Sequence, residues 1–224
     1  MPLIDYASQQ GSEYHKIRHA EMIGNAALIQ AWGHYAKLTY FADLKKGERV
    51  LEVGAGLGNN LVALGDIADV YATEPAPAAR EHANALGVKT VSSLDELEKG
   101  IRFHHILLRH VLEHVPEPHI LLTRLLQHLE PGGTLIVVLP IESPYTTPDP
   151  QDINHHLYAW SRQTIGNLLA DVGFQKIESE VNWYNGRRVL MPIFKRFGPE
   201  AYRKSVYWFG RIKGSAEIIA TASI

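Results

Sequence analysis

The chain has 224 residues, of which 46% are hydrophobic and 21% charged, with a formal net charge of −2. This length suffices for one sizeable core, so a single domain over residues 1–224 is predicted, and the charge excludes a general attraction to nucleic acid. Cysteine is absent, which excludes disulfides, cysteine-ligated metal and a cysteine nucleophile. The start lacks the features of a signal peptide, and no stretch reaches about 18 apolar residues, so we expect a cytoplasmic protein without a membrane span.

Residues 1–44 are expected to form an N-terminal helical cap. The segment from Ser12 to about Leu44 has helical spacing and no strand-like run. Tyr14, Arg18 and Asn25 lie on this pattern, and we expect them to lie over a bound cofactor. The alternative is an amphipathic helix whose polar residues are simply solvated.

From about residue 49, short β-rich apolar runs alternate with helical patterns, which is typical of a parallel sheet covered by helices. The expected strands are 50–53, 70–73, 88–91, 105–108, 135–139, 175–181 and 216–222. The expected helices are 59–66, 76–86, 94–99, 119–129 and a helix that opens at Ser161 and ends before Gly173.

Residues 183–214, between the last two expected strands, differ in composition from the rest. They include eight Lys or Arg, eight aromatic residues and one acidic residue. We interpret this segment as an insertion that forms a lid for an anionic or aromatic substrate. A surface for a membrane or nucleic acid and a contact between two copies of the chain are the alternatives.

A buried strand leads directly into three closely spaced glycines, Gly54, Gly56 and Gly58. Such glycines permit an unusual backbone conformation, close approach of a ligand and close helix packing. The next strand ends on Glu74, twenty residues beyond Gly54, where a carboxylate can accept both hydroxyls of a ribose. This combination suits a nicotinamide dinucleotide or an adenosyl cofactor. A dinucleotide turn places glycine at its sixth position, where this chain has Asn59, so the adenosyl cofactor is favoured.

With these residues in place, the sequence resembles the class I S-adenosylmethionine-dependent methyltransferases of bacterial small-molecule type. The likeness is carried by residues 52–58, 106–118 and 129–135 in the family's order, and it covers roughly 49–177. It implies a Rossmann-like α/β fold with a mostly parallel seven-stranded sheet and helices on both faces. The antiparallel last strand would be inserted beside the sixth.

The resemblance also implies S-adenosyl-L-methionine as the cofactor. Glu52 and the three glycines would contact its amino-acid part, Glu74 its ribose and the region of Ser93 its adenine. Many relatives have an aspartate in this last place, whereas here Asp95 is displaced. The expected cofactor-binding residues are Glu52, Gly54, Gly56, Gly58, Asn59, Glu74, Pro75, Ser93, Leu94, Arg109, Tyr14 and Arg18.

Three histidines are candidates for a catalytic base, since imidazole titrates near neutral pH. His110 follows the fourth expected strand, and His155 and His156 follow a proline-rich passage. We favour one of the latter pair by a small margin. His114 is expected to support the start of the next helix.

A metal interpretation would combine Asp149 and Asp152 with His155 and His156. Close spacing within one loop is a weak signal, and solvated surface residues explain it as well. We therefore expect no resident metal.

The sequence thus predicts methyl transfer to a small molecule, most readily at oxygen because candidate bases are plentiful. The expected context is natural-product or polysaccharide biosynthesis. Nitrogen or carbon acceptors, a non-catalytic adenosyl-binding or partner-binding module, and a nicotinamide-dependent oxidoreductase are the alternatives.

Overall fold

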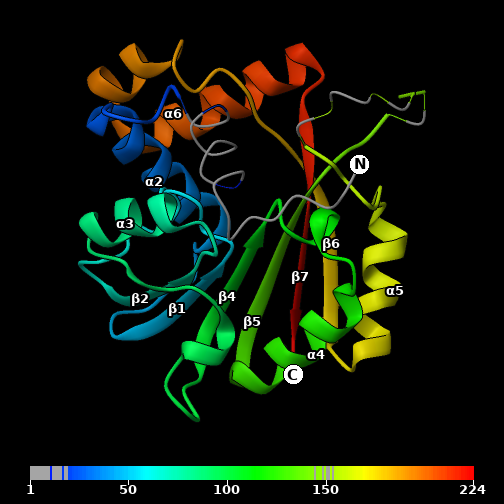
Figure 1. Ribbon diagram of the computed structural model, residues 1–224. Coiled ribbons are helices and arrows are strands. Elements are labelled where there is room, and N and C mark those ends of the chain that lie inside the picture. Colours follow the sequence, from blue (N-terminus) through cyan, green and yellow to red (C-terminus); the bar gives the residue numbers. More distant parts are fainter. Residues whose placement is uncertain are drawn as a thin grey trace.

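The computed structural model describes residues 11, 17, 20–143, 145–147, 149, 152 and 154–224. Its centre is a seven-stranded sheet of order β3-β2-β1-β4-β5-β7-β6 (Figure 1). The strands are β1 (Glu48–Val53), β2 (Ala68–Thr73), β3 (Lys89–Val91), β4 (Phe103–Arg109), β5 (Leu129–Pro140), β6 (Gln175–Trp183) and β7 (Ala216–Ser223). Strands β1 to β5 pair in parallel, whereas β7 is antiparallel to both β5 and β6. The predicted seven-stranded sheet, with its last strand inserted antiparallel beside the sixth, is confirmed.

The central strands are apolar on both faces because helices cover both sides of the sheet. Ile106, Leu107 and Leu108 of β4 are all fully buried, as are Val137 and Val138 of β5. Continuous apolar runs of this kind are typical of parallel strands.

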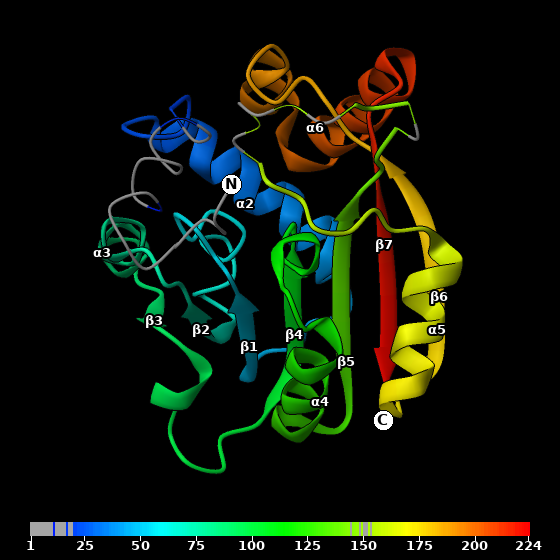
Figure 2. The same ribbon diagram turned by 45° about the vertical axis from the view of Figure 1, so that its right-hand side comes forward.

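Two hydrophobic clusters divide the helices between the two faces (Figure 2). One face is covered by α2 (Ala26–Tyr40), α3 (Pro77–Ala85) and α6 (Met191–Lys213). The other is covered by α4 (Pro118–His128) and α5 (Arg162–Val172). The α5 helix opens with a capping box between Ser161 and Thr164 and ends at Gly173 with φ of 108°. These are the start and stop signals that the sequence predicted.

Two of the expected helices are wrong as regular helices. Residues 59–66 form successive turns, with hydrogen bonds such as Leu61 N to Gly58 O and Leu64 N to Leu61 O. Two asparagines, one glycine and one aspartate in this short stretch disfavour a helix. Residues 94–99 contain only the 3₁₀ turn η1 (Leu94–Glu96), where the Glu96 carboxylate instead accepts the backbone N–H of Ser92.

Helices α2 and α6, from opposite ends of the sequence, pack against each other at the carboxyl ends of the parallel strands (Figure 1). Asn25 caps α2 by accepting the backbone N–H of Leu28 at 3.1 Å. Helix α6 occupies most of the insertion 183–214 and is kinked at Gly198, which precedes Pro199. Tyr14 and Arg18 of the expected cap lie outside the described residues. No helix within the described ranges is both long and apolar enough to span a membrane.

Candidate active site

A pocket of about 360 Å³ lies at the carboxyl ends of β1 and β4. Residues from β1, its following turn, the end of β4, α2 and the segment after β6 line it. It brings together the predicted residues Glu52, Gly54, Gly56, Asn59, Arg109, His110 and His156. The cofactor and acceptor candidates of the sequence therefore meet in one cavity.

The other predicted residues within the described ranges do not line this pocket; they are Gly58, Glu74, Pro75, Ser93, Leu94 and His155. Ser93 and Leu94 follow β3, toward the edge of the sheet. The carbonyl of Pro75 accepts a hydrogen bond from the Arg80 guanidinium at 2.9 Å.

The glycine turn has the backbone that the sequence predicted, with φ of 68° at Gly54, 55° at Gly56 and 78° at Gly58. A Cβ on Gly54 would meet Val111 Cγ2 at 2.7 Å. One on Gly58 would lie 3.0 Å from Ala83 Cβ of α3. The third glycine thus allows α3, rather than the segment directly after it, to pack close.

Glu74 is almost fully buried and supports the glycine turn directly. One carboxylate oxygen accepts the backbone N–H of Gly56 at 2.7 Å, and the other accepts that of Ala76 at 2.8 Å. Glu74 therefore ties the end of β2 to the turn after β1.

Glu52 reaches the pocket from β1 and is 1% exposed. Its Oε1 accepts a hydrogen bond from Asn60 Nδ2 at 2.5 Å, and Asn60 Oδ1 accepts the Trp32 indole N–H at 2.8 Å. Its Oε2 is buried without a hydrogen-bond partner among the described residues. Burial raises the pKa of Glu52 to about 8.

These features fit an adenosyl cofactor that carries positive charge. The buried Glu52 Oε2 and Asn59 Oδ1 atoms both lack partners among the described residues, and both residues line the pocket. Buried acceptors without partners are costly, and an ammonium group would satisfy them. The turn at Gly54 is also too crowded for any side chain at that position.

Next to the pocket, a buried polar network joins α2 to the three strands β4, β6 and β7. Glu217 of β7 is fully buried, and its Oε2 accepts Arg109 Nη2 at 3.0 Å. Its Oε1 accepts the Tyr40 hydroxyl at 2.6 Å and Asn182 Nδ2 at 2.9 Å. Burial opposes ionisation of Glu217, but Arg109 and then His110 outweigh it and lower the pKa to about 2. The carboxylate is therefore ionised at neutral pH.

His110 lies between two buried carboxylates, at the end of β4. Its Nε2 is 3.2 Å from Glu217 Oε2, and its Nδ1 is 3.6 Å from Glu113 Oε1. The backbone φ of 55° is unusual for a residue with a side chain and turns the ring into the site. Burial and then the Arg109 charge lower the pKa of His110, so the neutral ring is favoured.

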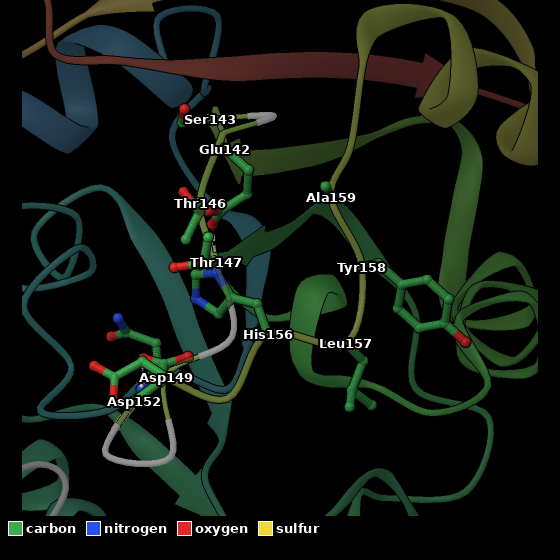
Figure 3. A pocket seen from close by; sticks show the side chains of 11 residues that line it. Glu142, Ser143, Thr146, Thr147, Asp149, Asp152, His156, Leu157, Tyr158 and Ala159 are labelled. Atoms are coloured by element: carbon green, nitrogen blue, oxygen red, sulfur yellow. Dashed lines mark hydrogen bonds and ion pairs between the residues drawn. The ribbon is translucent and has the colours of Figure 1, made fainter.

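His156 joins this pocket to a second one of about 480 Å³. The described residues that line the second pocket all belong to the loop between β5 and α5, from Glu142 to Ala159 (Figure 3). His156 Nδ1 faces Glu142 Oε1 at 2.5 Å, whereas His155 lines neither pocket (Figure 3). Asp149 and Asp152 line the second pocket, and Asp152 accepts the backbone N–H groups of Asn154 and His155.

Two aromatic rings, Trp32 of α2 and Tyr184, and two arginines form one wall of the pocket. Arg187 lies 4.7 Å from the Trp32 ring centroid, and Arg109 lies 5.0 Å from it. Arg109 also lies 5.5 Å from the Tyr184 ring. This wall offers positive charge beside flat apolar surface, which suits an anionic or aromatic ligand.

Several residues at the site were missed from the sequence. Glu217 is the clearest, although an acid inside the apolar run of the last strand is a signal of a buried partner. The sequence around Trp32 and Asn60 contains no comparable indication that these residues belong to the site. His114, expected to support a helix start, instead lines the pocket within the 3₁₀ turn η2 (Leu112–His114).

Comparison with known proteins agrees with this geometry. A methyltransferase domain family matches residues 25–179. The ubiquinone biosynthesis O-methyltransferase of Azorhizobium caulinodans is 32% identical over 123 residues, which cover 49% of this chain and 46% of that protein. The chain thus spans about half the length of this relative.

Solved structures show the same fold. A TehB-like S-adenosylmethionine-dependent methyltransferase from Corynebacterium glutamicum has a TM-score of 0.58 at 16% identity, covering 96% of this chain and 97% of its own. Phosphoethanolamine N-methyltransferase 2 from Haemonchus contortus, in complex with S-adenosyl-L-methionine, has a TM-score of 0.56 at 18% identity. The match covers 85% of this chain and 52% of that one. Together with the family match over most of its length, this places the chain among the S-adenosylmethionine-dependent methyltransferases of class I fold.

Proposed function

We propose that this chain methylates an oxygen atom of a small anionic or aromatic molecule, with S-adenosylmethionine as donor. The observation that carries the proposal is the position of His110, whose ring lies in the pocket against the ionised Glu217. A hydroxyl acceptor must lose its proton during transfer, and a neutral, oriented imidazole can take it.

The tautomer of His110 follows from its neighbour. An ionised carboxylate accepts hydrogen bonds and cannot donate them, so His110 Nε2 carries the proton and donates to Glu217 Oε2. The lone pair of the neutral ring is then on Nδ1. This nitrogen would accept the acceptor's hydroxyl proton, and Glu217 would stabilise the imidazolium that results. His110 therefore takes the part of base in our proposal, in place of the slightly favoured His155 or His156.

The remaining residues would bind and position the reactants. Bound at the glycine turn, the cofactor supplies a methyl group on a positively charged sulfonium. Glu52 and Asn59 would accept hydrogen bonds from its ammonium group, and Glu74 would hold the ribose hydroxyls. Arg187 would attract an anionic acceptor, and Trp32 would stack on its flat part.

Helix α6 and the segment before it act as a lid over the acceptor in this proposal. Tyr184 and Arg187 belong to the insertion and line the pocket that contains His110. An ordered wall of this kind excludes water, which favours methyl transfer to the acceptor. The relatives named as ubiquinone biosynthesis O-methyltransferase and phosphoethanolamine N-methyltransferase act at different atoms, so the preference for oxygen rests on His110.

Incubation with isotopically labelled cofactor and a panel of phenols, carboxylates, sugars and amines tests the proposal. We expect label on a hydroxyl-bearing acceptor and tight cofactor binding by calorimetry. Label on amines alone would show the acceptor atom to be nitrogen. Cofactor binding with no labelled product across the panel would favour the non-catalytic adenosyl-binding module instead.

A further inference from the structure

Three side chains with metal-binding atoms converge on the edge of the pocket. Glu113 and His114 belong to the turn η2 after β4, and His156 comes from the loop before α5. One ligand atom from each lies within 4.8 Å of the others. All three line the 360 Å³ pocket.

Glu113 is the most unusual member of this group, because it is fully buried. Neither of its carboxylate oxygens has a hydrogen-bond partner among the described residues. The closest imidazole nitrogens to Oε1 are His110 Nδ1 at 3.6 Å and His114 Nε2 at 3.9 Å, both beyond hydrogen-bond range. A buried carboxylate in this position needs a proton or a cation to offset its desolvation.

A carboxylate orients one of the two histidines. His156 Nδ1 donates to the Glu142 carboxylate, which fixes the tautomer and leaves Nε2 with its lone pair (Figure 3). A carboxylate that orients a ligating histidine in this way is a recurrent feature of metal sites.

We propose that Glu113, His114 and His156 bind one divalent transition-metal ion at the acceptor end of the pocket. Two imidazoles and one carboxylate form a donor set that suits zinc and related first-row ions. In a tetrahedral zinc site the ligand atoms are separated by about 3.4 Å. Modest side-chain rotations would bring the three residues to that separation. Three protein ligands leave a coordination position for another oxygen.

The open position gives the ion a role that rests on the proposed function. An acceptor oxygen bound to the ion would be held beside His110, and the positive charge would favour its deprotonated form. The binding site itself depends only on the three side chains, so metal binding and methyl transfer can be tested separately.

Competition between the purified protein and a chromogenic chelator for Zn²⁺ or Mn²⁺ alone tests the site. We expect one ion per chain and at least about tenfold weaker binding in Glu113→Gln and in His156→Asn. His119→Asn is the control, because that ring is exposed on α4 and is not part of the pocket lining, and it should retain wild-type affinity. Circular dichroism and urea unfolding establish that each variant is folded.

His155→Asn distinguishes this site from the loop cluster of Asp149, Asp152, His155 and His156. Wild-type metal affinity in His155→Asn supports the proposed site. A loss equal to that in His156→Asn would overturn it in favour of the loop cluster. The proposed site would also be overturned if the folded wild type bound no stoichiometric metal ion. The same would follow if Glu113→Gln and His156→Asn bound the ion as tightly as the wild type. Calorimetry with S-adenosylmethionine in excess chelator should show unchanged cofactor affinity, so failure of the metal site and failure of the methyltransferase proposal remain distinguishable.

Discussion

His110 Nε2 lies 3.2 Å from Glu217 Oε2, which couples the turn after β4 to the last strand of the sheet. If this carboxylate orients a catalytic imidazole, His110→Asn should lower turnover by about 10²- to 10⁴-fold. Asparagine tolerates the positive φ at this position, so the backbone should be retained. Single-turnover rates and cofactor affinity measure the effect, with His119→Asn as control. Turnover within threefold of wild type would remove His110 as the base.

Glu217→Gln should destabilise the protein by about 3–5 kcal/mol at pH 7, because it leaves the Arg109 guanidinium buried without its counterion. Urea unfolding measures this. Glu178→Gln, exposed on the neighbouring β6, should change stability by less than about 0.5 kcal/mol. Equal effects of the two substitutions would contradict the network's importance.

The same carboxylate predicts a loss of stability in acid. Its pKa is about 2 in the folded protein and 4.5 when unfolded, so the unfolded chain takes up a proton first as pH falls. The contribution, about 3 kcal/mol, is complete above pH 4.5 and is lost toward pH 2. The stability difference between wild type and Glu217→Gln should therefore shrink across this interval. A constant difference would argue against an ionised Glu217.

Glu52 has the opposite pH dependence. Its pKa is raised from 4.5 to about 8, so its contribution is present below pH 4.5 and is lost as pH rises through 8. Without cofactor, Glu52→Gln should be more stable than wild type at pH 9, by on the order of a few kcal/mol. Its cofactor affinity should fall by about 10- to 100-fold, because the ammonium of the bound cofactor favours the ionised carboxylate and glutamine cannot carry that charge. Unfolding at pH 6 and 9 and calorimetry measure both effects, and the exposed Glu81→Gln should show neither.

Gly210→Ala should loosen the lid. A Cβ there would lie 2.3 Å from the backbone nitrogen of Tyr184, so α6 must move away from the residue that lines the pocket. We expect destabilisation of about 1–3 kcal/mol and a raised acceptor KM. Gly65→Ala is the control, because its Cβ meets nothing within 4 Å. A neutral Gly210→Ala would show that the contact is not tight in solution.

Arg187→Gln tests the anionic part of the acceptor proposal. For an anionic acceptor found in the panel, KM should rise about tenfold or more, as expected for a lost charged contact. Cofactor affinity should not change. Arg188→Gln is the matched control, because Arg188 is exposed and does not line the pocket. Equal effects of both substitutions would indicate general charge attraction rather than a contact in the pocket.

The sheet could be predicted from the sequence because its strands are local apolar runs with clear boundaries. The glycine turn could be predicted equally well, since Gly54, Gly56 and Gly58 directly follow a buried strand. The prediction of a helix at 59–66 was wrong because the apolar spacing there is helical, while its glycine and two asparagines favour turns. The local sequence pattern predicts a helix there, whereas the tertiary structure places Asn60 where its side chain hydrogen-bonds both Glu52 and Trp32.

The site could be predicted only in part, because several of its contacts join distant segments. The sequence analysis identified Glu52 and His110 but could not pair His110 with Glu217, which follows it by more than a hundred positions. Nor could it show that Glu113, His114 and His156 converge, because that depends on how two loops fold over the sheet. Such proximity is set by the tertiary structure, and the distance between two residues along the sequence does not show whether they are in contact.

The insertion of β7 between β5 and β6 has a consequence for how the molecule is made. Within the described residues, β6 pairs with the sheet only through β7. It therefore cannot join the sheet until β7 has been synthesised and has paired with β5. Glu217 arrives with that strand. During synthesis the glycine turn and the first five strands can assemble early, whereas His110 gains its partner among the last events. A nascent chain would therefore form the part of the pocket that binds the methyl donor before His110 has the partner it needs to deprotonate an acceptor.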